Sequence, residues 1–441
     1  MIGVRKRGVV AGSSSLRIPR DLNITLQAGW PPRLQAQTVD AVLARPVPGE
    51  NANGRAAASP AADPSKLASV VVVTFNSLVF NRLALESVLV NTPPGTYELV
   101  IVDNASTDDT PAYLRALADG YGHVRPFLND RNLGFAAATN QGLKAARGNT
   151  LVLLNSDTLV APGWLERLQG HLADPAVGVV GPLTNRSATE AEIEVHYQTY
   201  AEFLEFASSV HKHRRPEVED VRTLTMFCVA MRRDVYEHVG PLDERFGQGM
   251  FEDHDYAMRV RAAGDRVVFA HDAFVHHFGQ ASMGKLDTDE YKRLFTANRQ
   301  LFEQKWGARW DVHQRRDPEY LRQIQRLREL LPRALPPRAT VAVVSRGDHE
   351  LLELDGLWAW HFPRAADGGF AGYHPADSAA AIAHVEELRE LGAEFLVFPE
   401  PAKWWLEHYR ELEKHLASSC RVVLDEPGTC RVYALVPEAR P

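Results

Sequence analysis

The sequence predicts an α/β fold in which a mostly parallel sheet is covered by helices on both faces. Apolar runs of strand length, such as residues 70–73, 99–102 and 151–154, alternate with helical stretches. No apolar run approaches the ~20 residues that cross a bilayer. With 441 residues, 45% of them hydrophobic and 24% charged, the chain has the composition of a globular protein of about two or three domains.

Net charge and cysteine content narrow the function classes. The net charge of −7 argues against a dedicated nucleic-acid-binding protein, because neutralising phosphates requires surplus Lys and Arg. The three cysteines are too few for a disulfide scaffold, and none is spaced as CxxC for structural zinc. The simplest location is therefore cytoplasmic, and any membrane contact is expected to be peripheral, at the cytosolic face.

Composition divides the chain into four parts. Residues 1–66 are rich in Pro, Ala, Gly and Asn, and such a stretch buries too little apolar area to offset its ordering entropy, so a flexible or disordered arm is expected. Residues 67–310 carry the alternation of strands and helices. Interleaved Arg and Glu predict a helical connector over 311–337, followed by a smaller accessory α/β domain over 338–441.

The order of elements in the main domain places polar residues at one edge of the sheet. After the strand at 70–73 come a helix from Leu78, a strand at 99–102, helices at 107–117 and 135–146, a strand at 151–154 and a helix opened by Pro162. Polar clusters follow the three strands, at 74–76, 103–106 and 155–157. Because α/β sheets bind ligands at the carboxyl ends of their strands, these clusters indicate a binding crevice.

Asp103 and Asp157 each come directly after a buried strand. A carboxylate at such a place accepts hydrogen bonds from a bound group or, together with phosphate oxygens, holds a hard cation such as Mg²⁺. The alternative is that each carboxylate only caps the helix that follows. The Asn, Ser, Thr and Asp residues at several strand ends together favour binding.

An acidic run, Glu252-Asp253-His254-Asp255, opens a predicted helix. Its carboxylates repel one another unless a cation, a helix N-terminus or a substrate proton is near. A general base requires such a placement, because helix donors stabilise a carboxylate at the mouth of a site. The alternative is an ordinary acidic first turn.

Two adjacent histidines, His276 and His277, follow an apolar run at residues 267–270 and a short strand-like stretch. Neutral imidazole is a suitable ligand for Mn²⁺ or Mg²⁺ at a site that a diphosphate completes. A structural role for either histidine is the alternative.

Seven segments, in this order, resemble the family 2 glycosyltransferases of the GT-A fold, especially the bacterial rhamnosyltransferase-like members. They are VVVTFN at 71–76, IVDNASTDD at 101–109, NDRNLGFAAATN at 129–140, LLNSDT at 153–158, CVAMRRDVYEHVGPLDERF at 228–246, FEDHDYAMRVRAAG at 251–264 and VHHFGQAS at 275–282. The resemblance covers roughly residues 68–300. It implies a GT-A (Rossmann-like nucleotide-diphospho-sugar transferase) domain that moves a sugar from a nucleotide-diphosphate donor to an acceptor hydroxyl with inversion.

The resemblance also assigns a donor site, residue by residue. Asp103 is expected to accept hydrogen bonds from the nucleotide base. A loop around Gly134 is expected to close over the donor, because glycine lets the backbone come near. The expected donor-binding residues are Thr74, Asn76, Asp103, Asn104, Arg131, Asn132, Gly134 and Ser156.

A divalent cation, Mg²⁺ or Mn²⁺, is the implied cofactor. Asp157 matches the surviving acid of the family's DxD motif, whose first position is Asn155 in this chain. His276 matches the histidine that completes the metal site in relatives. His277 is the second candidate, because the register across the pair is open.

The catalytic groups implied by the resemblance lie in the acidic run. Asp253 matches the general base, which takes the proton of the acceptor hydroxyl while that oxygen attacks the anomeric carbon. Glu252, grouped with it as catalytic, is expected to orient the acceptor or to cap the helix. One in-line displacement inverts the configuration and needs no protein nucleophile. Asp255 is expected to contact the acceptor or to cap the helix, and His277 is the other expected acceptor contact.

The first expectation for the donor is deoxythymidine-diphosphate rhamnose, otherwise a UDP-sugar. The expected acceptor is a cell-surface or secreted glycan, with a lipid-linked glycan included, as in polysaccharide or cell-wall biosynthesis. A nucleotidyltransferase is one alternative, but it would need a Gly-rich, basic loop after the first strand. A non-catalytic sugar-nucleotide or glycan-binding protein with a decayed site is the other, favoured by Asn155 and opposed by the intact acids.

Two regions allow two interpretations each. Residues 190–221 either contact the acceptor or form an amphipathic helix on the sheet. In the C-terminal domain, residues 345–348 follow a predicted strand without a GxGxxG pattern. The tryptophans there either stack on sugars or belong to the core; they are Trp358, Trp360, Trp404 and Trp405.

Overall fold

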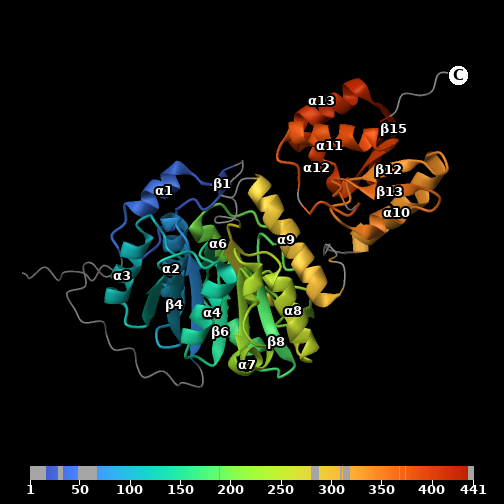
Figure 1. Ribbon diagram of the computed structural model, residues 1–441. Helices are drawn as coiled ribbons and strands as arrows, with labels where there is room; N and C mark the ends of the chain where they lie inside the picture. The colour runs from blue at the N-terminus through green and yellow to red at the C-terminus, as the bar shows by residue number, and fades with distance from the viewer. Residues whose placement is uncertain are drawn as a thin grey trace, which may run out of the picture. The chain divides into compact units, whose positions relative to one another are not determined.

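The structure is a computed structural model that describes residues 16–27, 33–47, 67–187, 189–279, 288–307, 310, 318–366, 368–372 and 374–435. The chain forms two compact units, residues 1–287 and 288–441 (Figure 1). Each unit has its own sheet covered by helices, so the predicted α/β class with a smaller C-terminal α/β domain is confirmed. Residues 280–282 of the last sequence motif lie outside the described residues.

The main sheet of the first unit has the strand order β5-β4-β3-β6-β10-β8-β11-β7, and β9 pairs with β11. The strands are β3 (Ala68–Thr74), β4 (Tyr97–Asp103), β5 (Val124–Leu128), β6 (Thr150–Leu154), β7 (Thr158–Val160), β8 (Val177–Leu183), β9 (Val218–Asp220), β10 (Cys228–Arg232) and β11 (Arg266–His277). β10 is antiparallel to both β6 and β8, so β3, β4, β5, β6, β8 and β11 all run in one direction.

Helices cover both faces of this sheet (Figure 1). Val71 and Val100 belong to one core cluster and Val70 and Val72 to the other, because successive side chains of a strand point to opposite faces. The helices are α2 (Leu78–Asn91), α3 (Thr110–Gly120), α4 (Phe135–Ala145), α5 (Trp164–His171), α6 (Tyr200–His213), α7 (Arg233–Val239) and α8 (Glu252–Ala262), and η1 (Glu244–Phe246) is a short 3₁₀ turn. α4 lies very close to β3, since a Cβ on Gly142 would come within 2.4 Å of Val71.

Part of the stretch predicted to be a flexible arm is folded. Residues 16–27 and 33–47 contain β1 (Leu26–Gln27), β2 (Arg33–Leu34) and α1 (Ala36–Leu43), and the rest of 1–66 lies outside the described residues. Five apolar side chains are buried in the core of the first unit: Ile18, Leu22, Ile24, Leu34 and Val42. The segment is too polar to form a core alone, but it only has to dock these side chains on a core that the sheet already supplies.

The second unit contains a sheet of order β13-β12-β14-β16-β15. Its strands are β12 (Thr340–Val343), β13 (Trp358–His361), β14 (Phe395–Pro399), β15 (Arg421–Glu426) and β16 (Cys430–Ala434). Its helices are α9 (Thr288–Trp306), α10 (Pro318–Ala334), α11 (Ser378–Glu390), α12 (Trp404–His408) and α13 (Arg410–Ser419), with 3₁₀ turns η3 (His349–Leu352) and η4 (Glu400–Ala402). Trp405 is fully buried, whereas Trp358 and Trp404 keep 64% and 41% of their surface exposed.

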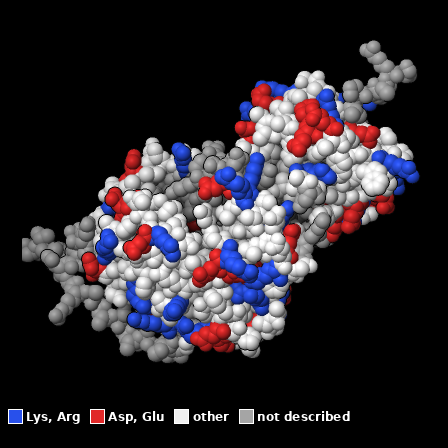
Figure 2. Space-filling model, viewed as in Figure 1, with Lys and Arg blue, Asp and Glu red and all other residues white. Residues whose placement is uncertain are grey.

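On the visible face of each unit, Lys and Arg lie interspersed with Asp and Glu (Figure 2). Among the helices in the described ranges, none combines the length and the apolar character needed to span a bilayer.

Candidate functional site

The polar clusters meet at one edge of the first sheet. The carboxyl ends of β3, β4, β6, β8 and β11 share this edge, because these strands are parallel. α8 runs back against β11 and ends near its first residue, so the helix N-terminus with Glu252 lies toward the same edge. A bond from the Phe135 N–H to the Gly247 carbonyl (3.0 Å) joins the loops before α4 and α8 there.

Buried Asp103 organises a hydrogen-bond network at the end of β4. Its Oδ1 accepts from the Thr74 hydroxyl (2.9 Å) and from the Ser106 hydroxyl (2.5 Å), and its Oδ2 accepts from the Ser106 N–H (2.9 Å). The Asn76 N–H donates to the Ser106 oxygen (2.7 Å), and Asn76 Oδ1 accepts from the Thr107 N–H (2.8 Å). Hydrogen bonds thus connect Thr74, Asn76 and Asp103, which the family resemblance assigns to nucleoside binding. We call these three residues the nucleoside set.

Asn104 holds the loop that is expected to close over the donor. Its Nδ2 donates to Asn132 Oδ1 (2.8 Å) and to the Gly134 carbonyl (3.1 Å), while its Oδ1 accepts from the Leu133 N–H (2.9 Å). Gly134 has φ +84°, and a Cβ there would lie 2.3 Å from the Gly247 carbonyl oxygen. Only glycine fits this position without displacing one of the two loops.

The turn after β6 carries Ser156 and Asp157. The Asn155 N–H donates to the Phe227 carbonyl (2.7 Å), which fixes the turn to the start of β10. Ser156 and Asp157 are 9% and 7% exposed, respectively. Arg131, by contrast, is an exposed residue of the neighbouring loop.

Asp157 faces His277 across the edge. The distance from Asp157 Oδ1 to His277 Nε2 is 3.5 Å. His277 Nδ1 lies 3.0 Å from the Arg186 carbonyl, which can only accept, so Nδ1 carries the proton and a neutral ring has its lone pair on Nε2. Phe227 stacks on the ring at 4.7 Å and fixes its plane. Nε2 is buried and, among the described residues, has no hydrogen-bond partner.

This pair fits a divalent cation. A lone pair and a carboxylate oxygen that face each other in a buried place repel unless a proton or a metal ion lies between them. Two neighbouring ligands of an octahedral ion, each about 2.1 Å from it, lie about 3 Å apart. Within the described ranges no group of three or more His, Cys, Asp or Glu side chains is arranged to hold a metal, so Asp157 and His277 would need oxygens of the bound substrate to complete the coordination.

His276 points to the other face of β11. Its Nδ1 lies 2.7 Å from the Tyr197 hydroxyl, and its ring packs on Phe278 (4.5 Å) and Phe203 (6.0 Å). Burial lowers the pKa of His276 to about 3, so the ring is neutral at physiological pH. The structure therefore brings His277, rather than His276, against Asp157.

Glu252 and Asp253 open α8 in opposite protonation states. Burial, followed by repulsion from Asp253, raises the pKa of Glu252 to about 8. Burial also acts to raise the pKa of Asp253, but the charge and hydrogen bonds of His254 outweigh it and the pKa is lowered. The N–H and Nδ1 of His254 lie 2.8 and 2.9 Å from Asp253 Oδ1. At neutral pH Asp253 can accept a proton, whereas Glu252 is a neutral carboxylic acid.

Asp255 serves the helix. It is fully buried, and its Oδ2 accepts from Arg259 Nε at 2.9 Å. Arg259 also donates to the Val239 carbonyl (3.0 Å). Asp255 therefore has no exposed surface with which to meet the acceptor contact expected of it.

Backbone strain is concentrated at the same edge. Among the described residues of the first unit, five that are not glycine have positive φ angles of 53° to 75°: Asn76, Ser77, Ala105, Met250 and Phe251. Each such residue costs of order 1 kcal/mol or more, and such residues cluster at functional sites.

The segment 190–221 contains an amphipathic helix, which is one of its two predicted interpretations. α6 buries Tyr200, Phe203, Ala207 and Val210 and begins with a capping box between Thr199 and Glu202. Tyr197, just before it, is the residue that contacts His276.

A polar cluster that was not predicted from the sequence follows β8. Asn185 Oδ1 accepts from the His277 N–H (2.8 Å), its Nδ2 donates to the His277 carbonyl (3.1 Å), and the Arg186 carbonyl fixes the ring. The signal was available, because residues 184–187 (TNRS) follow a buried strand just as the other clusters do. Arg186 is exposed, and its guanidinium donates to the Phe278 carbonyl at 3.5 Å.

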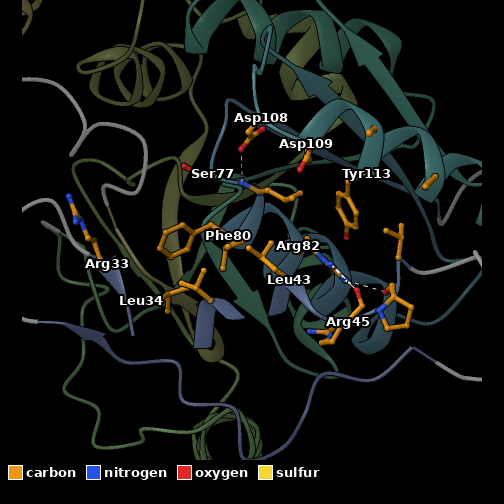
Figure 3. Close-up of a pocket in the computed structure, with 17 residues that line it drawn as sticks. Arg33, Leu34, Leu43, Arg45, Ser77, Phe80, Arg82, Asp108, Asp109 and Tyr113 are labelled. Carbon is orange, nitrogen blue, oxygen red and sulfur yellow. Dashed lines mark hydrogen bonds between the residues drawn. The ribbon is translucent and has the colours of Figure 1, made fainter. Parts of the chain in front are cut away.

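A cavity of about 930 Å³ lies behind the start of α2 (Figure 3). Arg33, Leu34 and Leu43 of the N-terminal segment line it together with Phe80 of α2 and Tyr113 of α3. The cavity borders the nucleoside set through Ser77, which follows Asn76, and through Asp108. It is not lined by Asp157, Glu252, Asp253, His276 or His277.

Known proteins resemble this chain. Residues 69–240 match the family described as glycosyl transferase family 2. Glycosyltransferase AglE of Haloferax volcanii is 28% identical over 214 residues, which cover 47% of this chain and 66% of that protein. The O-antigen biosynthesis protein RfbC of Myxococcus xanthus is 30% identical over 207 residues, 44% of this chain and 16% of that protein. The chain thus spans less than two thirds of either relative.

Among solved structures, mannosyltransferase PcManGT from Pyrobaculum calidifontis, in complex with GDP-Man and Mn²⁺, aligns with a TM-score of 0.43 and 19% identity, over 86% of this chain and 91% of that one. The family match spans four of the seven sequence motifs in full and continues into the fifth. Residues 69–240 therefore form a glycosyl transferase family 2 domain. This confirms the resemblance to family 2 that the motifs predict, whereas the rhamnosyltransferase-like character stays a prediction.

Proposed function

We propose that this chain is an inverting glycosyltransferase that moves a sugar from a nucleotide-diphosphate donor to an acceptor hydroxyl of a glycan. The observation that carries the proposal is the pair of Asp157 Oδ1 and His277 Nε2, 3.5 Å apart, on the sheet edge that also bears Asp253. The role of RfbC in O-antigen biosynthesis supports a glycan acceptor, and AglE supports glycosyl transfer. Deoxythymidine-diphosphate rhamnose remains the first donor to test, with UDP-sugars second.

Asp253 is the proposed general base. Its lowered pKa keeps it ionised at neutral pH, so it can take the proton of the acceptor hydroxyl as that oxygen attacks the anomeric carbon. Neutral Glu252 adds no second negative charge beside it and offers an O–H donor. His254 fixes the Asp253 carboxylate through two contacts to Oδ1.

Asp157 and His277 would hold a Mg²⁺ or Mn²⁺ ion. When bound, the ion would supply charge neutralisation for the departing diphosphate. The network of Thr74, Asn76 and Asp103 would bind the nucleoside, and the loop held by Asn104 would cover the donor and exclude water.

A donor screen tests the proposal. The purified chain is offered nucleotide sugars with Mn²⁺ or Mg²⁺, and release of the nucleoside diphosphate is measured with and without EDTA. Release from one donor that is lost with EDTA, with Asp157→Asn and with His277→Gln supports the metal-assisted reaction. Asp234→Asn, an exposed aspartate on α7, is the matched control and should behave as the unaltered chain. Binding of a donor without turnover, even with acceptors supplied, would favour the non-catalytic alternative.

A further inference from the structure

We propose that the folded N-terminal segment is a positioning element of the candidate metal site. Residues 20–24 hold Tyr197 against His276, and this contact fixes the end of β11, where His277 faces Asp157. The inference rests on the proposed function in one respect, since it takes Asp157 and His277 as the cation-binding pair.

Three backbone hydrogen bonds clamp the segment to the chain around Tyr197. The Ile24 N–H donates to the Gln198 carbonyl (2.8 Å), the Tyr200 N–H to the Leu22 carbonyl (2.9 Å), and the Ala201 N–H to the Arg20 carbonyl (2.8 Å). Leu22 and Ile24 are 6% and 1% exposed. They belong to the core cluster that also contains Tyr200, Phe203 and Phe274. The segment therefore fixes both the backbone and the apolar support of residues 198–201.

Tyr197 transmits this support to β11. Its ring packs on Phe206 (5.4 Å) and Phe203 (5.7 Å) of α6 and on Phe274 of β11 (6.2 Å). Its hydroxyl lies 2.7 Å from His276 Nδ1. Burial raises the pKa of Tyr197, so the hydroxyl keeps its proton at physiological pH and the contact does not change with pH there.

The end of β11 is consequently held from two sides. On one face Tyr197 fixes the ring of His276, and on the other Asn185 and the Arg186 carbonyl fix His277. Because the two histidines are consecutive, a shift of His276 moves the backbone of His277. Groups that orient a metal-binding histidine typically change metal affinity by 10- to 100-fold when they are removed.

The test is a titration of Mn²⁺, followed by electron paramagnetic resonance, on the full chain without donor. Tyr197→Phe removes one oxygen and keeps the ring packing, and we expect it to weaken Mn²⁺ binding by about 10-fold. Tyr236→Phe, a partly exposed tyrosine on α7, is the matched control and should bind Mn²⁺ as the unaltered chain does. A hydroxyl with only a structural role would lower Tm and leave the Mn²⁺ affinity unchanged.

A double-mutant cycle tests the connection to the N-terminal segment. Leu22→Ala loosens the clamp, and we expect weaker Mn²⁺ binding at temperatures well below its Tm. In the Tyr197→Phe background the same change should cost almost nothing further, because the coupling runs through the missing hydroxyl. Independent, additive losses would overturn the connection.

The outcomes separate this inference from the proposed function. If the unaltered chain binds no Mn²⁺, the proposed metal pair and the positioning role both fall. If the unaltered chain binds Mn²⁺ and Tyr197→Phe binds it equally well, the metal pair stands and only the positioning role is overturned.

Discussion

In both units polar residues follow the parallel strands, but the polar atoms of the two sets differ in whether they have hydrogen-bond partners. In the second unit Ser345 follows β12, and its hydroxyl lies 2.6 Å from His361 Nδ1, whose ring in turn reaches His349 at 3.3 Å. In the first unit the Nε2 atoms of both adjacent histidines and Oε2 of Glu252 are buried without a hydrogen-bond partner in the described part of the chain. Native proteins rarely leave such atoms unsatisfied. Polar strand ends alone therefore do not indicate a candidate site, whereas unsatisfied imidazole and carboxyl atoms beside them, which a metal ion or a proton can satisfy, do.

The largest expected effect is the loss of transfer activity when the proposed base of the first unit is replaced, and its absence would contradict the contrast between the two units. Asp253→Asn should lower kcat for transfer by roughly 10²- to 10⁴-fold, because an amide cannot accept the proton of the acceptor. The measurement is kcat with donor and acceptor both saturating. Asp348→Asn is the counterpart in the second unit, where Asp348 accepts from the Tyr320 hydroxyl at 2.7 Å. It should lower Tm and leave kcat unchanged, and an equal loss of kcat would contradict the contrast.

The next largest effect is expected from the loop around Gly134 in the first unit. Gly134→Ala places a methyl group 2.3 Å from the Gly247 oxygen at a φ of +84°, so one of the two loops has to move. We expect about a 10-fold weaker donor affinity by calorimetry and a stability loss of about 1–3 kcal/mol. The control is Gly122→Ala, where no atom lies within 4 Å of an added Cβ. Equal donor affinity in Gly134→Ala would show that the loop does not cover the donor.

The buried carboxyl of Glu252 in the first unit should make the stability of the chain depend on pH. The pKa of Glu252 is raised to about 8 in the folded chain, so the folded state holds a proton that the unfolded state loses near pH 4.5. Stability from this group is present below pH 4.5 and is lost as pH rises toward 8. Glu252→Gln should remove this slope and stabilise the chain at pH 8 by about 1–3 kcal/mol. Urea denaturation between pH 5 and 8 measures it, and parallel curves for both chains would contradict the buried-acid interpretation.

The smallest effect belongs to the second unit. Ser345→Ala removes one buried hydrogen bond to His361 and should cost about 1 kcal/mol of stability. Transfer by the first unit should not change. Burial lowers the pKa of His361 to about 4. The stability that its neutral ring contributes is therefore present above pH 6.5 and is lost as pH falls toward 4. A loss of transfer activity in Ser345→Ala would give the second strand-end set a functional role.

Much of the fold and part of the site could be predicted from the sequence. β3 and β4 match the predicted strands at 70–73 and 99–102, because continuous apolar runs between turn residues leave few alternatives. β13 was missed because its exposure is mixed, from an exposed Trp358 to a buried His361.

The remaining features depend on tertiary contacts. Whether His276 or His277 meets Asp157 depends on the pairing of β11 with β7, where His277 lies opposite Thr158, and a shift by one residue would exchange the two faces. The docking of residues 16–47 also depends on a core that lies elsewhere in the sequence. Local composition contains neither kind of information.

Because α8 leads directly into β11, two candidate site residues lie on one continuous segment that relatives can exchange as a unit. One helix, one turn at Gly264 and one strand carry both the candidate base Asp253 and the candidate metal-side His277, whereas the nucleoside set comes from β3 and β4. Under the proposed function, an exchange of residues 252–277 between relatives would transfer the proposed base and the proposed metal ligand together, and would leave the proposed nucleoside-binding residues of the recipient unchanged.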